Sequence, residues 1–334
     1  MLPEAEMAQK KTARALGAAS QKIDWKSLIL FGLLVLVMVI SSILTPKFLT
    51  VTNIMNVIMQ VSMIMLVGSA ATLLMISGNF DLSVGMVLAL SGVLHAFMSK
   101  NGIPTNLSII LAILIGAGLG LLNGVMVARL NITPVIATLG MMYVARGLAF
   151  IVAWIDGGAN VTTGLPRDFE ALGRTMVGPV PSYLLLFFVI IAIFYFIFAK
   201  TNLRKYAFAI GGNRTAAVLS GINAQAVVLV LYVFVGALAA FAGVTVASRV
   251  GSGAPNVGTG FEFDVIVAIV LGGTSIYGGE GSFSGMIIGA LIVGFMGNTL
   301  NLLNVPFFYQ PVVKGMILIG AVLLIRKIEE KLGR

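Results

Sequence analysis

The chain consists of long apolar runs separated by short polar segments. A transmembrane helix needs about 20 predominantly apolar residues, so each run is long enough for one helix or more. The short alternating strands of a transmembrane barrel do not occur. The pattern therefore predicts an all-α polytopic membrane protein. The runs without a charged residue are 27–46, 48–80, 101–128, 175–199, 215–248 and 281–313.

The runs divide into about ten transmembrane segments. This organisation predicts a transmembrane domain over 27–325 between a basic tail (1–26) and a short tail (326–334), with a polar loop at 200–226. The predicted segments are 27–45, 53–77, 83–99, 106–128, 134–154, 181–199, 226–248, 262–277, 284–303 and 307–325.

The charged residues predict how the chain is oriented in the membrane and which classes of protein are excluded. With both termini in the cytoplasm, 14 basic residues fall inside and five outside, as the positive-inside rule requires. The net charge of +9 is therefore explained by a membrane and not by nucleic acid. Only 10% of residues are charged, against about 25% in soluble domains. Cysteine is absent, so the sequence predicts no disulfide, and no metal site is predicted.

Two glycine-flanked polar stretches interrupt the apolar pattern, SGNFDLSVG (77–85) and GGTSIYGGEGS (272–282). Non-helical backbone at membrane depth is tolerated where it is buried in protein or lines a watery cavity. Interrupted segments at matching positions of two halves indicate a substrate path, so we expect broken helices in each half. The residues assigned to the breaks are Gly78, Gly85, Gly272, Gly273, Gly278, Gly279 and Glu280.

Polar residues inside the apolar runs each allow more than one role. Asp81 or Ser83 would cap the next helix, or Asp81 would contact a substrate, and the two roles are compatible. Asn298, Asn301 and Asn304 share a helix face and would bond between helices or read hydroxyl groups.

Four ionisable residues near the membrane are interpreted one by one. Arg146 would snorkel to the outer surface or pair with a buried carboxylate, and His95 would fill a polar position. Glu262 and Asp264 would complement the dipole of the helix that they open, or they would line an outer mouth.

Small residues recur every fourth position in two segments, at Gly116, Gly120 and Gly124 and again at Gly285 and Gly289. Such faces allow close approach of helix backbones. Packing within one bundle is favoured over a seam between two chains.

The loop 201–227 is the longest on the predicted cytoplasmic side. Asn213 or Thr215 would cap a short helix in it, and Gly221 would end that helix. Such a helix suits docking of a partner; a plain connection with stop-transfer charges is the alternative.

Five stretches resemble the permease subunits of bacterial ABC importers for ribose, arabinose, xylose and galactosides. They occur in the family's order and span nearly the whole chain after residue 26. The stretches are SGNFDLSVGMVLALSG, ITPVIATLGMMYVARGLAF, YAFAIGGNRTAAVLSGI, GTGFEFDVIVAIVLGGTSIYGGEGS and the run NTLNLLNV…YQ…VKG.

The resemblance implies a multi-pass subunit of the bacterial inner membrane that imports a monosaccharide by alternating access and is not itself an enzyme. It implies a homodimer, a cytoplasmic ATPase holding ATP and Mg²⁺, and a periplasmic sugar-binding protein; this chain itself needs no cofactor. The substrate path is expected at Asn79, Phe80, Asp81, Ser83, Asn298 and Asn301. The ATPase coupling loop is expected at Asn213, Arg214, Thr215, Ala216, Ala217 and Gly221, where Thr215 replaces the glutamate common in ABC importers.

Two rival functions compete with this interpretation. A secondary transporter driven by protons or sodium would use Asp81 as its coupling site. An intramembrane hydrolase would need Ser91 and His95, and nothing else completes such a site. No GxxxxGK[ST] phosphate loop occurs, so ATP would have to be hydrolysed by another chain. The sequence does not identify the sugar.

Overall fold

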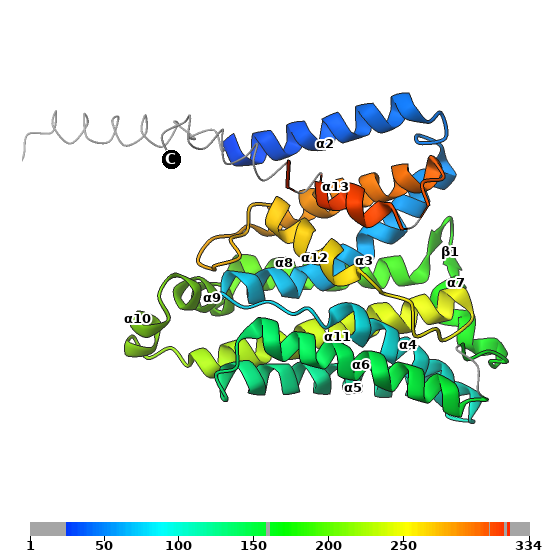
Figure 1. The fold of residues 1–334 in the computed structure, drawn as a ribbon, viewed down its shortest axis with the longest axis horizontal. Coiled ribbons are helices and arrows are strands. Elements are labelled where there is room, and N and C mark those ends of the chain that lie inside the picture. The colour runs from blue at the N-terminus through cyan, green and yellow to red at the C-terminus, as the bar shows by residue number, and fades with distance from the viewer. Residues whose placement is uncertain (1–24, 158–160, 307, 317–318, 321–334) are drawn as a thin grey trace, which may run out of the picture.

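The computed structural model describes residues 25–157, 161–306, 308–316 and 319–320. The long helices lie side by side as a bundle (Figure 1). They are α2 (Trp25–Leu44), α3 (Val51–Ile76), α4 (Val84–Lys100), α5 (Thr105–Ala128), α6 (Pro134–Ile155), α8 (Ser182–Lys200), α11 (Ala224–Val250), α12 (Phe261–Leu271) and α13 (Phe283–Leu302). Residues 310–316 and 319–320 are also helical.

Short elements distinguish the two ends of the bundle. One end, here the α9–α10 end, carries α9 (Asn202–Gly212) and α10 (Arg214–Leu219), on the left of Figure 1. The opposite end, here the hairpin end, carries the remaining short elements. These are η1 (Arg167–Glu170), α7 (Ala171–Arg174) and the antiparallel pair β1 (Met176–Val177) and β2 (Val180–Pro181).

The apolar runs become helices, so the all-α polytopic prediction is confirmed. In the described residues, six helices are long and apolar enough to cross a membrane, and α2 and α4 are shorter apolar helices. The segment predicted at 262–277 is wrong at its end: α12 stops at Leu271, because Gly273 takes a φ of 86° and breaks the helix. The prediction at 307–325 lies only partly within the described residues, and the tails 1–26 and 326–334 lie almost wholly outside them.

The glycine faces pack within the bundle, as predicted. A methyl group on Gly120 would overlap the Tyr232 carbonyl of α11, and one on Gly124 would lie 3.0 Å from Leu229 Cα. On α13, Gly289 meets the Ala268 carbonyl of α12 in the same way, and Gly285 meets the backbone of Gly272, just after α12. The close approach replaces side-chain volume by direct backbone contact, which small residues permit.

Helix α6 lies at an edge of the bundle, and its outward side chains are mostly apolar. Arg146 is exposed among them, so it lies on the outer surface of this chain. The alternative in which Arg146 pairs with a buried carboxylate is therefore wrong.

Two non-helical stretches enter the bundle from opposite ends. The first crossing segment (residues 77–83) joins α3 to α4, and the second crossing segment (residues 251–260) joins α11 to α12. Both run between the helices in Figure 1. The second lies along α4, because Gly253 approaches Val93 and Gly258 approaches Gly85. The stretch 251–260 thus enters the bundle from the end opposite to 77–83, and the prediction that 272–282 is the counterpart of 77–83 stays a prediction.

Candidate functional site

The two crossing segments meet where α4 and α12 begin. A methyl group on Gly85 would overlap both the Gly258 carbonyl oxygen and the Glu262 carboxylate. Glu262 is 5% exposed, and its Oε2 has no hydrogen-bond partner among the described residues. Burial of a carboxylate oxygen without a partner costs free energy, so the meeting point carries a polar group that the bundle does not satisfy. Glu262 is therefore buried at the meeting point and does not face an outer mouth.

Asp81 holds the first crossing segment to α5. Its Oδ1 accepts the backbone N–H of Ser83 at 2.7 Å and the Ser83 hydroxyl at 2.6 Å. Its Oδ2 accepts from Nδ2 of Asn123 at 3.2 Å, and the same Nδ2 donates to Ser83 Oγ at 3.0 Å. All three side chains are buried. Asn123 was not assigned to the site from the sequence, because a contact 42 residues away leaves no local pattern.

The cap predicted for α4 takes a different form. Neither the Asp81 nor the Ser83 side chain accepts an N–H from within the first turn of the helix; the Asp81 carboxylate accepts instead the N–H of Ser83, which precedes the helix. This is an Asx-type turn that fixes the chain just before the helix. The carboxylate thus has three donors as partners. Its contact with a substrate stays a prediction.

Two other residues predicted for the path, Asn79 and Phe80, lie beside this network. Asn79 is buried and donates to the Ser77 carbonyl at 3.1 Å, so it closes a local turn. Phe80 is half-buried, and its carbonyl accepts the Tyr232 hydroxyl of α11 at 3.0 Å. The first crossing segment is therefore tied to α5 and to α11 by one side chain each.

The crossing segment, the 272–282 link and α9 touch at one point, here the glycine junction (Ile76, Gly78, Gly211, Gly278 and Gly279). The Gly279 N–H donates to the Ile76 carbonyl at 2.8 Å. A methyl group on Gly211 would overlap that carbonyl oxygen, and one on Gly278 would lie 2.7 Å from the Gly78 nitrogen. Both predicted breaks therefore meet α9 through backbone atoms.

Within the 272–282 link, glycines make the turns. Gly278 and Gly279 have φ values of 88° and 78°, which favour glycine. Gly272 is needed for a different reason, because its Cα lies against the Gly285 backbone of α13. The Glu280 carbonyl accepts the Ser275 N–H at 3.1 Å and its side chain is exposed. A functional role of the Glu280 side chain in this break stays a prediction.

The loop 200–226 folds as expected around Asn213. Its Oδ1 accepts the Ala216 N–H at 2.9 Å and caps α10, and Gly221 (φ 84°) follows the helix end. Ala217 is buried, whereas Arg214, Thr215 and Ala216 are exposed. Sequence reasoning missed Val218 and Leu219 of the same helix, which are 52% and 84% exposed. Exposed apolar side chains beside a capped helix form a surface suited to a protein partner.

A polar cavity of about 250 Å³ lies between α3, α12, α13 and the helical residues 310–316. Lys314 Nζ is 2.7 Å from Oδ1 of Asp264 and 3.0 Å from its Oδ2. Gln310 Nε2 donates to Asn301 Oδ1 at 2.8 Å. Of the predicted path residues, only Asn301 lines this cavity. Gln310 and Lys314 belong to the run YQ…VKG, which was noted for its resemblance and not as part of the path. Gln60 also lines the cavity.

Asn298 does not line the polar cavity. Its side-chain amide exchanges two hydrogen bonds with Asn53 of α3, at 2.8 and 2.9 Å, and both residues are buried. This is the interhelical bonding alternative. Asn304 lies beyond the end of α13 with a φ of 54°, so it does not share the helix face.

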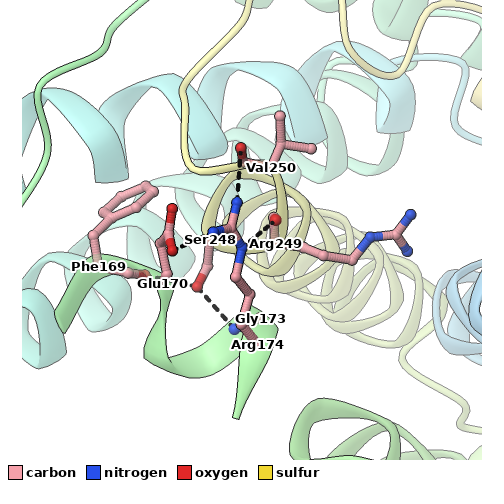
Figure 2. Close-up of polar contacts among 7 residues, drawn as sticks. All are labelled: Phe169, Glu170, Gly173, Arg174, Ser248, Arg249 and Val250. Atoms are coloured by element: carbon pink, nitrogen blue, oxygen red, sulfur yellow. Dashed lines mark hydrogen bonds and ion pairs between the residues drawn. The ribbon is translucent and has the colours of Figure 1, made fainter. Parts of the chain in front are cut away.

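At the hairpin end, a clamp joins α7 to the end of α11 (Figure 2). Ser248 Oγ donates to the Phe169 carbonyl at 2.7 Å and accepts the Gly173 N–H at 2.8 Å. The Arg174 guanidinium donates to the carbonyls of Arg249 and Val250 and to Glu170. Arg174 is therefore engaged within this chain.

His95 is buried and belongs to a structural network. Its Nδ1 lies 2.7 Å from Ser108 Oγ, and its ring stacks on Phe169 at 4.4 Å. It does not bond to Ser91, whose hydroxyl has no partner among the described residues. A hydrolase would need these two groups to be joined, so the geometry does not support that rival.

Comparison with known proteins gives one consistent result. The family model described as "Branched-chain amino acid transport system / permease component" matches residues 53–325. The ribose import permease protein of Bacillus subtilis (strain 168) is 41% identical over 296 residues, covering 89% of this chain and 91% of its own. The ribose import permease protein of Escherichia coli (strain K12) is 37% identical, covering 91% and 94%.

A third relative is named for a different sugar. The L-arabinose ABC transporter permease protein of Azospirillum brasilense is 37% identical over 314 residues, covering 93% of this chain and 90% of its own. No solved structure matches the chain.

Proposed function

Because the chain belongs to the family of permease components of branched-chain amino acid transport systems, we propose that it is the membrane subunit of an ATP-driven importer of a monosaccharide. The observation that carries this proposal is the similarity to ribose and arabinose permeases at 37–41% identity over about nine-tenths of each chain. The polar crossing segments support it, because interrupted segments in two halves are typical of transporters.

ATP is used by a separate ATPase in this proposal. The sequence has no phosphate loop of its own, so ATP and Mg²⁺ bind to the partner and no cofactor binds to this chain. The α9–α10 end is the cytoplasmic side and offers the capped helix α10 with Val218 and Leu219 exposed. We assign the contact with the ATPase to the residues from Asn213 to Gly221.

Movement of α9 reaches the crossing segments through the glycine junction. Gly211 of α9 touches the Ile76 carbonyl, and Gly279 donates to that same carbonyl. A pull on the α9–α10 loop therefore acts on the start of the first crossing segment and on the link before α13 together. In the proposed mechanism, this rearrangement opens the path alternately to the two sides of the membrane.

The hairpin end faces the periplasm in this proposal and receives a sugar-binding protein. The loop carrying η1, α7 and the hairpin is held on the end of α11, next to the second crossing segment. Docking on that loop therefore adjoins the segment that enters the bundle. A second copy of the chain completes the subunit pair in the inner membrane of a bacterium, with both termini in the cytoplasm.

The test is to purify the tagged chain from its native membrane in mild detergent and to identify the proteins that accompany it. We expect an ATPase whose hydrolysis is stimulated by one sugar-loaded binding protein. The variant Leu219→Asp should release this ATPase, whereas Leu130→Asp, exposed in the α5–α6 turn, should retain it.

The ion-coupled rival predicts the opposite results in whole cells. If uptake of the sugar survives depletion of ATP and is lost when the proton gradient collapses, the proposal is wrong. In that case Asp81 becomes the residue to test for coupling.

A further inference from the structure

We propose that the polar cavity between α3, α12, α13 and residues 310–316 is a binding site for the uncharged, polyhydroxylated ring of the transported sugar. The inference rests on the proposed function. It adds where in the chain the sugar binds and that the bound sugar is uncharged. The cavity has a volume of about 250 Å³.

A second cavity of about 280 Å³ provides the contrast. It shares α3 and α13 with the polar cavity but is lined by apolar side chains, with Ser62 as the single hydroxyl. Phe48, Phe188 and Phe295 lie among its lining residues. A cavity without polar groups suits a hydrocarbon chain, because a hydroxyl group placed there would lose its hydrogen bonds to water. The sugar is therefore assigned to the polar cavity.

The polar cavity presents donors and acceptors from four elements. Gln60 comes from α3, Asp264 from α12, Asn301 from α13, and Gln310 and Lys314 from the last helical segment. Carboxylate oxygens accept hydrogen bonds, an ammonium donates them, and amides do both. Vicinal hydroxyls can donate to one group and accept from its neighbour, so the set matches a polyol.

The remaining wall is apolar. Phe261, Met63, Ile64 and Val293 line the cavity beside the polar groups. Small-molecule sites commonly combine an apolar wall with a few placed polar groups that fix orientation. The carbon face of a sugar ring would lie against this wall while its hydroxyls point to the amides.

The ion pair determines the charge of the ligand. Asp264 and Lys314 neutralise each other at 2.7 Å, and their side chains are 25% and 27% exposed. A ligand carrying a carboxylate, phosphate or ammonium would unbalance this pair in a partly desolvated site. The site therefore accepts neutral sugars and excludes sugar acids, sugar phosphates and amino sugars.

The stem of Lys314 lies across α13 at a glycine. Its Cε would be 3.8 Å from a methyl group placed on Gly297. Asp264 and Glu262 both lie in the first turn of α12, and Glu262 is buried at the meeting point of the crossing segments. The ion pair is therefore close along the chain to that meeting point. A sugar whose hydroxyl donates to Asp264 or accepts from Lys314 thus acts on the start of α12.

The test uses the absence of cysteine in the sequence. Gln60→Cys places one thiol in the cavity wall, and Asn101→Cys, exposed at the far end of α4, is the matched control. The purified chain, with the partners that accompany it, is labelled with a small uncharged thiol reagent while ribose, arabinose, glucuronic acid and glucosamine are each added.

We expect the transported neutral sugar to slow labelling of Gln60→Cys about tenfold at about ten times its dissociation constant, since only unoccupied sites react. The acid and the amine should not protect, and Asn101→Cys should label at one rate throughout. Unchanged labelling of Gln60→Cys in a variant that still transports the sugar would overturn the cavity assignment alone.

A different result would overturn the proposed function. If the unmodified chain with its partners transports no monosaccharide, the proposed function has failed whatever the labelling shows. Should Gln60→Cys fail to assemble with its partners, Asn301→Cys provides a second thiol in the same wall.

Discussion

The two crossing segments enter the bundle in the same way but are held by different interactions. The first is fixed by side chains, since Asp81 bonds to Asn123 and Tyr232 bonds to the Phe80 carbonyl. The second is fixed by glycine conformation and backbone contact, with Gly251, Gly258 and Gly260 at φ values of 75°, 88° and 84°. One segment depends on hydrogen-bond partners and the other on the absence of side chains.

This difference predicts different sensitivities to mutation. An added methyl group should destabilise the second segment more than the first. The loss should be largest at a glycine that has a positive φ and no space for a side chain. Removing a polar group should damage the first segment most, because buried donors would lose their acceptor. Substitutions at four positions test this contrast, and the expected effect falls from Gly258 to Arg174.

Gly258→Ala should have the largest effect. The left-handed conformation costs about 1–2 kcal/mol for a residue with Cβ, and overpacking against the Gly85 carbonyl adds about 1–3 kcal/mol. The control is Gly102→Ala, which has nearly the same φ (87°) but no atom within 4 Å. Thermal unfolding of the two detergent-purified variants measures how much stability each substitution removes. Equal losses for the two variants would show that the meeting point is not tightly packed.

Asp81→Ala should come next. It leaves the Ser83 N–H buried without an acceptor and removes one of the two acceptors of Asn123 Nδ2, at a cost of about 1–3 kcal/mol. Asp81→Asn should cost less, because the amide oxygen still accepts from Ser83. Rotation of Asn123 would then let its oxygen, which has no partner among the described residues, accept the new amide N–H. Unfolding and sugar uptake should be measured together.

The result for Asp81→Asn separates structure from charge. If the variant folds and assembles normally but loses transport, a negative charge is required at this position and the network alone does not explain Asp81. Normal transport would assign Asp81 to positioning of the segment.

Tyr232→Phe should have a smaller effect. It removes one hydrogen bond to the Phe80 carbonyl, worth about 0.5–1.5 kcal/mol, and keeps the buried ring in place. Tyr195→Phe removes a hydroxyl from an exposed tyrosine of α8 and serves as the control. A melting temperature identical to that of the unmodified chain would show that the first segment does not depend on α11.

Arg174→Ala should have the smallest effect on stability, about 1 kcal/mol or less, because the guanidinium is half exposed and its contacts are screened. Its effect should be local. Hydrogen exchange at residues 251–253 should become faster, since Arg174 holds the carbonyls just before them. Arg167→Ala should leave exchange there unchanged, and equal exchange in both variants would exclude the clamp as a support of the second segment.

The helices could largely be predicted from the sequence, because hydrophobic run length directly reports membrane depth. The cap at Asn213 and the packing role of Gly120 and Gly124 could also be predicted, since both follow local spacing rules. These features depend on residues within one turn or one face of a helix.

The site was harder to predict, because its contacts join distant residues. The glycine-rich stretch 251–260 has the composition of a surface loop, and nothing in its pattern distinguishes a loop from a buried crossing. The pairs Asp81–Asn123 and Asp264–Lys314 join residues 42 and 50 positions apart, so no periodicity reveals them. Periodicity predicts which residues are buried but not what they contact.

The glycine junction has a mechanical consequence. A contact made by side chains can yield when a rotamer shifts, at a cost of about 0.5–1.5 kcal/mol for a departure of roughly 30°. Gly211, Gly278 and Gly279 have no rotamers, and they meet through backbone atoms and one hydrogen bond to Ile76. The contact is therefore stiff. A displacement of α9 must therefore either move both breaks by a similar distance or break the contact between them. Little of the movement is lost in side-chain adjustment.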